Sequence, residues 1–241
     1  MTRLDDPALV ASEYADESRL RRRAAGYAGA GTRDDARIPL VDAVVAAAPR
    51  RVLEVGCGWG ELAEWIARET GAEVIAIDLS PRMVELAVER GVVARVADVQ
   101  DLPFADGEFD LAVAAWMLYH VPYLERGLAE IARVLRAGGT FVAATNSRFH
   151  LHELRELVGS GSSTLKFSRE DGVEHLRPHF ATIDRIDVDG MLELTDRAAV
   201  EDYVSASISM SPFVENLSAE IDLPFVARRG SSVFVARKAP P

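Results

Sequence analysis

The chain has 241 residues, of which 49% are hydrophobic, a composition that suits one globular domain with elaborations and excludes a disordered protein. Its formal net charge of −11 argues against a nucleic-acid partner, because the only short basic run is Arg19 to Arg23. A single cysteine, Cys57, excludes an internal disulfide. The first residues carry no apolar segment of the kind found in signal peptides, and no apolar run reaches the roughly 20 residues of a membrane helix. We therefore expect a cytoplasmic protein without a membrane partner.

The first part of the chain alternates helical and extended patterns. Residues 1–33 are polar and predict a helical segment, and aliphatic residues at helical spacing predict a helix from Asp34 to Ala48. Strands are predicted at Val52–Val55, Glu73–Asp78, Val92–Ala97, Phe109–Ala114 and Thr140–Ala144. Helices are predicted at Glu61–Arg68, Pro81–Arg90 and Leu124–Leu135. This alternation indicates a doubly wound parallel α/β sheet.

Beyond Thr145 the pattern becomes less regular. Helices are predicted at His150–Val158 and Asp196–Ser207, a further segment at Ser168–Arg177 and a sixth strand at Ala181–Val188. Two short apolar runs, Leu223–Arg228 and Ser232–Arg237, flank an Arg-Gly-Ser sequence and predict a closing β-hairpin.

The segment from Val52 to Gly60 predicts a strand that ends in a glycine-rich turn over which a ligand lies. The first alternative is that the turn binds a dinucleotide, which would make the protein a nicotinamide-dependent oxidoreductase. The G-x-G-x-x-G pattern of dinucleotide-binding turns is absent, however, because Glu61 occupies the position of the third glycine. A carboxylate there repels a pyrophosphate, and Glu54 before the turn favours a positively charged ligand. The turn therefore predicts a nucleoside ligand without phosphates.

Acidic residues follow the next two predicted strands. Asp78 is placed to accept hydrogen bonds from the ribose hydroxyls. Asp98 is placed to accept a hydrogen bond from the exocyclic amine of adenine, while the Val99 N–H donates to a ring nitrogen of the same base. Leu79 and Met83 are expected to sandwich the base. Three strand ends then line one crevice.

In these stretches the chain resembles a class I S-adenosylmethionine-dependent methyltransferase of the type-11 group, whose members act on small molecules. The matching stretches are Val52 to Gly60, Val74 to Met83, Ala97 to Phe104, Phe109 to His120 and Ala129 to Gly139. The resemblance implies S-adenosyl-L-methionine as cofactor, S-adenosyl-L-homocysteine as product, and a Rossmann-like seven-stranded sheet with an antiparallel last strand. It also implies a lid at residues 1–33 and a methyltransferase domain at residues 34–241, with core motifs at 50–146 and substrate-side elaborations at 147–215.

The resemblance implies roles for individual residues. Gly56 and Gly58 contact the methionine part, and Glu54 and the Trp116 backbone hold its amino group. Tyr14 and Arg23 cover the cofactor from the lid, with the arginine on the methionine carboxylate. Where related lids continue with Leu-His, this chain has Gly26 and Tyr27, which alters the substrate side of the lid.

The remaining predictions concern the reaction. His120 and Tyr119 follow the fourth strand beside the expected methyl group, and His120 is a candidate general base or a positioning residue. The spacing of His150 and His152 does not fit a metal site, so no metal is expected. We expect a methyltransferase acting on a small-molecule acceptor, with secondary metabolism as its setting. The oligomeric state stays open, and a non-catalytic S-adenosylmethionine-binding regulator or scaffold stays as an alternative.

Overall fold

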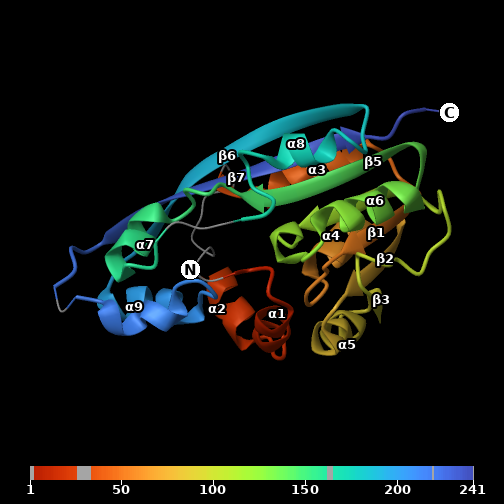
Figure 1. The fold of residues 1–241 in the computed structure, drawn as a ribbon. Coiled ribbons are helices and arrows are strands. Elements are labelled where there is room, and N and C mark those ends of the chain that lie inside the picture. Colours follow the sequence, from red (N-terminus) through yellow and green to blue (C-terminus); the bar gives the residue numbers. More distant parts are fainter. Residues whose placement is uncertain (1–2, 26–33, 162–164, 219, 241) are drawn as a thin grey trace.

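The computed structural model describes residues 3–25, 34–161, 165–218 and 220–240, and it forms a seven-stranded sheet with helices on both faces (Figure 1). The strands are β1 (Arg51–Val55), β2 (Glu73–Asp78), β3 (Val93–Val96), β4 (Phe109–Ala115), β5 (Leu135–Asn146), β6 (Thr182–Leu194) and β7 (Phe225–Arg237). The helices are α1 (Pro7–Glu13), α2 (Ser18–Ala25), α3 (Arg37–Ala46), α4 (Glu61–Thr70), α5 (Pro81–Glu89), α6 (Leu124–Val134), α7 (His152–Val158), α8 (Gly172–Leu176) and α9 (Arg197–Ala206). Two short 3₁₀ turns are η2 (Leu118–His120) and η3 (Ser211–Asn216).

The strand order β3-β2-β1-β4-β5-β7-β6 confirms the predicted α/β fold. The first five strands are parallel, and β7 runs antiparallel to both β5 and β6. Because β1 lies between β2 and β4, the chain reverses its direction of winding at β1. The carboxyl ends of β1 and β4 therefore flank the crevice in which sheets of this kind bind ligands.

The central strands are buried on both faces because aliphatic residues fill them almost without interruption. Side chains of α3 and α4 pack on one face and those of α6 and α8 on the other, which gives two separate cores. None of the described helices is long and apolar enough to cross a membrane.

Local sequence signals explain the helix boundaries near the crevice. The Ser80 hydroxyl accepts a hydrogen bond from the Met83 N–H, and Pro81 occupies the first turn of α5 as predicted. Gly71 ends α4 in the left-handed conformation, with φ of 68°. The predicted strands and helices up to β5 are confirmed, with boundaries that shift by a few residues.

The predicted closing hairpin is wrong, because both apolar runs belong to the single strand β7. All of β7 pairs with β6, from Leu194 opposite Phe225 to Thr182 opposite Arg237. Gly230 does not adopt a positive φ, so it does not form a turn. A glycine is favoured there because the Arg169 guanidinium packs closely against the strand, at 3.2 Å from where a Cβ would lie. The antiparallel end of the sheet is thus made by two long strands joined through α9 and η3.

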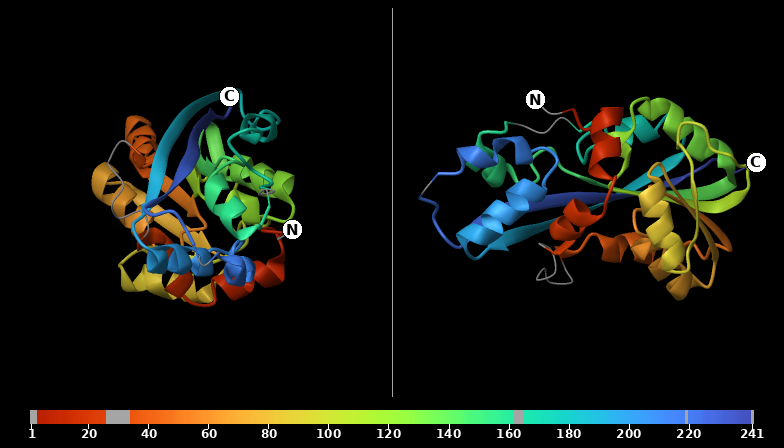
Figure 2. Two further views of the ribbon diagram at one scale, coloured as in Figure 1. Left: turned by 90° about the vertical axis from the view of Figure 1, so that its left-hand side faces the viewer. Right: turned by 90° about the horizontal axis from the view of Figure 1, so that it is seen from below.

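The long strands β6 and β7 extend past the rest of the sheet, and α7 and α9 lie beside their far end (Figures 1 and 2). Leu192, Leu194 and Ala227 pack there with side chains of α7 and α9 in a third core. Helix α2 from the chain's beginning contacts α9. The start of the chain therefore lies against α9, while Gly26 and Tyr27 lie outside the described residues.

Candidate active site

The glycine turn after β1 bends sharply, since Gly56, Gly58 and Gly60 have φ values of 71°, 51° and 79°. A Cβ at Gly56 would lie 2.7 Å from the Met117 side chain, so packing alone requires glycine there. A Cβ at Gly58 would meet only Leu20, at 3.7 Å. The missing side chain of Gly58 leaves open space beside the turn, and a ligand can approach the backbone closely.

Asp78 stands at the end of β2 and orders the turn. One carboxylate oxygen accepts a hydrogen bond from the Gly58 N–H at 2.9 Å, and the other accepts one from the Ser80 N–H at 2.9 Å. Burial is the main cause that raises the pKa of Asp78. Each carboxylate oxygen has a second lone pair, which suits a ribose hydroxyl.

Glu54 lies at the end of β1 and is 2% exposed. Its Oε2 atom is buried and has no hydrogen-bond partner among the described residues. Burial, with a further contribution from the charge of Asp78, raises the pKa of Glu54 to about 8. The buried Glu54 and the half-buried Asp78 are neighbouring carboxylates without a cationic partner among the described residues, and such a pair favours a positively charged ligand.

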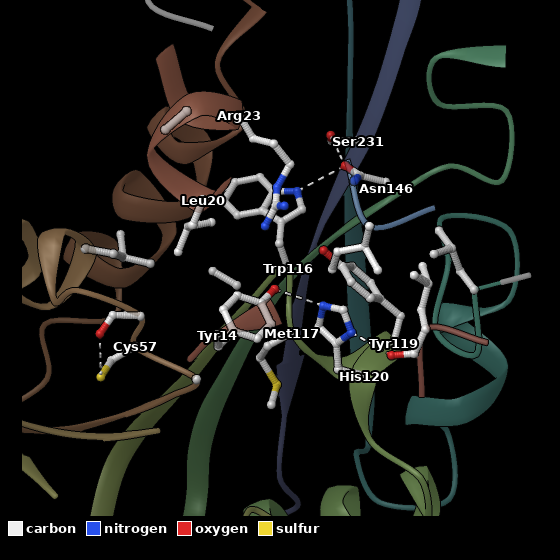
Figure 3. Close-up of a pocket in the computed structure, with 18 of the residues that line it drawn as sticks. Tyr14, Leu20, Arg23, Cys57, Trp116, Met117, Tyr119, His120, Asn146 and Ser231 are labelled. Atoms are coloured by element: carbon white, nitrogen blue, oxygen red, sulfur yellow. Dashed lines mark hydrogen bonds between the residues drawn. The ribbon is translucent and has the colours of Figure 1, made fainter. Parts of the chain in front are cut away.

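A cavity of about 510 Å³ opens above these residues. The predicted site residues that line it are Tyr14, Arg23, Glu54, Gly56, Gly58, Asp78, Leu79, Asp98, Val99, Trp116, Tyr119 and His120. Figure 3 shows Tyr14 and Arg23 from the start of the chain beside Trp116 and His120, which follow β4. Met83 is not among the lining residues, because it lies on the first turn of α5 facing inward and is fully buried.

Around the expected base, Leu79 is 54% exposed and borders the cavity, and Val99 is buried. Both oxygens of Asp98 contact the Gln100 side-chain amide, at 3.1 and 3.0 Å. Gln100 also lines the cavity and was not predicted from the sequence. An adenine amine would share Asp98 with this amide.

His120 binds the start of the chain through both ring nitrogens. Its Nδ1 lies 2.7 Å from the Leu4 carbonyl oxygen, and since a carbonyl only accepts, Nδ1 carries the proton. The Nε2 atom then accepts the Tyr14 hydroxyl at 3.0 Å (Figure 3). Burial lowers the pKa of His120 to about 4 and raises that of Tyr14 to about 12, so both side chains are neutral near pH 7. The Tyr119 ring packs on the histidine edge at 4.5 Å.

Arg23 connects the lid segment to α9. Its Nη1 atom donates to the Ala206 carbonyl at 2.7 Å and to the carboxylate of Glu13. Glu13 is buried, and its other oxygen accepts a hydrogen bond from Arg19 at 3.0 Å. The sequence did not single out Glu13, although its place beside Tyr14 makes it the anchor of the segment.

The Tyr14 hydroxyl helps to hold the start of the chain against His120. In Tyr14→Phe this bond is lost, which removes about 1 kcal/mol and should raise the population with a detached N-terminal segment roughly fivefold. Trypsin should therefore cut at the arginines of α2 about five times faster, as measured by the initial cleavage rate. The exposed Tyr123 supplies the control variant Tyr123→Phe, and equal cleavage of the two variants would contradict the assignment.

Trp116 follows β4 with a positive φ of 53°, which a non-glycine residue adopts only when its surroundings hold it. Its indole Nε1 donates to the Asn146 side-chain oxygen at 3.1 Å, and the Ser231 hydroxyl donates to the same oxygen at 2.9 Å (Figure 3). Asn146 is the last residue of β5, Ser231 pairs with it from the middle of β7, and neither residue was predicted. They fix the indole at the boundary between the two ends of the cavity.

The second end of the cavity lies toward α7 and α9. Tyr203 and the loop at residues 207–210 line it. Arg155 and Arg229 line it without having been predicted, because an arginine in a helix or strand ordinarily faces solvent. Within the described ranges no group of three histidine, cysteine or acidic residues could hold a metal ion.

Comparison with known proteins identifies the chain's relatives. The family model described as "Methyltransferase domain" matches residues 53–143. Methyltransferase GfsG of Streptomyces halstedii is 37% identical over 158 residues, which are 62% of this chain and 56% of that protein. A ubiquinone biosynthesis O-methyltransferase of Xanthomonas oryzae is 40% identical over 119 residues, 46% of this chain and 49% of the relative. The chain thus spans about half the length of these relatives.

Solved structures share the fold at low sequence identity. The [4+2]-cyclase SpnF superposes with a TM-score of 0.59 at 24% identity, over 84% of this chain and 81% of the cyclase. A phosphoethanolamine N-methyltransferase of Haemonchus contortus, solved with S-adenosylhomocysteine, gives 0.66 at 16% identity, over 99% of this chain and 61% of that one. These two matches establish the architecture alone.

One relative covers enough of both chains to define the family. An uncharacterized methyltransferase of Mycobacterium bovis is 31% identical over 173 residues, which are 69% of this chain and 68% of the relative. Together with the matched domain and the strand order, this relationship shows that the chain belongs to the class I S-adenosylmethionine-dependent methyltransferases.

Proposed function

We propose that this chain transfers a methyl group from S-adenosylmethionine to a small organic acceptor. The observation that carries the proposal is the pair formed by the buried Glu54 and the half-buried Asp78, two carboxylates that lack a cationic partner among the described residues. A ligand with an ammonium group and two ribose hydroxyls satisfies both of them. Gly58 leaves room for that ligand beside the turn.

The bound sulfonium supplies a methyl group that is already activated for displacement. The protein's task is then to bind, orient and exclude water. Glu54 would hold the amino group together with the Trp116 backbone, Asp78 the ribose, and Asp98 and Val99 the base, with Leu79 against its face. Arg23 would reach the methionine carboxylate while Glu13 keeps its guanidinium in place.

We further infer that residues 1–33 act as a lid and that residues 147–215 contribute most of the acceptor side. His120 serves this closure as a positioning residue, because its two nitrogens hold Leu4 and Tyr14 and its pKa of about 4 makes it a weak base. Tyr119, which packs on it, also lines the cavity and offers a hydroxyl for the acceptor.

Formation of S-adenosylhomocysteine on a panel of phenols, hydroxy acids and amines tests the proposal. The name of the Xanthomonas relative makes hydroxyl acceptors the first to try. We expect turnover with at least one acceptor and none in Asp78→Ala. Tight S-adenosylmethionine binding without turnover on the whole panel would favour a non-catalytic regulator instead. The expected secondary-metabolic setting and cytoplasmic location stay predictions, and cell fractionation checks the second.

A further inference from the structure

The second end of the cavity, toward α7 and α9, is the end that we assign to the methyl acceptor, and it contains an arginine held in place by neutral groups. Arg155 lies on α7, is half-buried and lines the cavity. Its Nη1 atom donates to the Ser209 hydroxyl at 3.1 Å, and its Nε donates to the His150 carbonyl oxygen at 3.3 Å. Two hydrogen bonds from different segments fix the guanidinium without neutralising it.

Among the described residues Arg155 forms no ion pair with a carboxylate. The two acids of α7 are engaged elsewhere, Glu153 with Arg228 and Glu156 with His152 at 3.1 Å. Burial lowers the pKa of Arg155, and the only group opposing that shift is Tyr203. A partly desolvated cation without a counter-ion is costly to keep unless a ligand supplies the negative charge.

The other arginine at this end lies near an acidic residue. Arg229 donates to the Asp34 carbonyl at 3.2 Å, and its charge helps to lower the pKa of Asp35. The single positive charge of Arg155, which forms no ion pair among the described residues, matches a single carboxylate better than a doubly charged phosphate. The lining of the cavity also includes Leu151, Leu165, Ile208 and Met210, so we expect the rest of the ligand to be apolar.

We propose that the methyl acceptor is an apolar carboxylic acid whose carboxylate binds the Arg155 guanidinium, at the end of the cavity formed by α7 and the loop after α9. This inference rests on the proposed methyltransferase function. The acid's position at Arg155 directs the remainder of the molecule past Trp116 toward the cofactor end. Arg155 is a residue that determines specificity, and it leaves the cofactor's own contacts unchanged.

The test uses pairs of probes that differ only in the anionic group. The pairs are 4-hydroxybenzoate with 4-hydroxybenzamide, and hexanoate with hexanamide, titrated calorimetrically into the enzyme saturated with S-adenosylhomocysteine. We expect the wild type to bind each acid at least about tenfold more tightly than its amide, as a charge-assisted hydrogen bond provides. Phenyl phosphate should bind more weakly than the acids.

Three variants isolate the role of Arg155. Arg155→Gln should abolish the preference for acids, and Arg155→Lys should retain part of it because the charge remains without the fork. Arg177→Gln is the matched control, since Arg177 is exposed after α8 and does not line the cavity. All three should bind S-adenosylhomocysteine like the wild type, which also reports that they fold.

Several outcomes overturn the proposal. They are equal binding of acids and amides, no binding of either acid at millimolar concentration, a preference for phenyl phosphate, or an acid preference that persists in Arg155→Gln. Weaker S-adenosylhomocysteine binding in Arg155→Gln assigns the arginine to the cofactor and also refutes it. If the wild type does not bind S-adenosylhomocysteine at all, the proposed methyltransferase function is refuted. If it binds S-adenosylhomocysteine but shows no preference for acids, only the role of Arg155 is refuted.

Discussion

Asp78→Ala is expected to weaken binding of S-adenosylhomocysteine by at least about 100-fold, because two charge-assisted hydrogen bonds to the ribose are lost together. The substitution also releases the Gly58 and Ser80 amides that the carboxylate holds at 2.9 Å, so the glycine turn loses its fixed shape. Isothermal titration calorimetry measures the affinity, and thermal unfolding verifies that the variant is folded.

Asp101 provides the control for this substitution. It is exposed, follows β3 by a few residues and does not line the cavity, so Asp101→Ala removes the same charge without touching the site. We expect its affinity to equal that of the wild type. Retained affinity in Asp78→Ala would refute the ribose assignment and remove the main support for a nucleoside ligand at the end of β2.

Binding of S-adenosylhomocysteine is expected to strengthen by about tenfold per pH unit between pH 6 and pH 7.5. In the ligand-free protein Glu54 has a pKa of about 8 and is protonated in this range. The ligand's ammonium group requires the ionised carboxylate, so one proton is released on binding. Affinity measured across this range, with buffers of different ionisation enthalpy, gives both the slope and the number of protons.

Two controls separate Glu54 from other titrating groups. Glu54→Gln should bind more weakly at pH 7.5 and show a flat profile, and 5′-methylthioadenosine, which has no amino acid part, should show a flat profile with the wild type. A steep profile for Glu54→Gln would disprove the assignment. Because the folded carboxyl keeps its proton between about pH 4.5 and about 8 while the unfolded one loses it, the ligand-free wild type should become less stable as pH rises through this window.

The central sheet could be predicted closely because its information is local. Continuous aliphatic runs gave β1, β2 and β4, and the Ser80-Pro81 pair located the start of α5. The cofactor-side residues lie at the ends of these strands, so their convergence on one cavity follows from the parallel arrangement. That part of the site needed no knowledge of distant contacts.

The rest depends on contacts that sequence spacing does not reveal. A Gly-Ser pair inside β7 has the same composition as a turn, and only the pairing with β6 decides that the strand continues through Gly230. Met83 has the spacing of a residue beside the base, but the direction of the first turn of α5 buries it. Arg155 is held by Ser209, 54 residues further along the chain, and Glu13 is held by Arg19 and Arg23 of the following helix.

The third core, around Leu192, Leu194 and Ala227, has a consequence for how this enzyme can diversify. It supports α7 and α9 on the far end of β6 and β7, while the glycine turn rests on the separate core beneath α3 and α4. Because the two cores have no side chain in common among the described residues, we expect substitutions in the third core to reshape the end of the cavity near α7 and α9 with little effect on Glu54 or Asp78. Under the proposed function, acceptor choice can then change among descendants of one ancestor while the methyl donor stays constant.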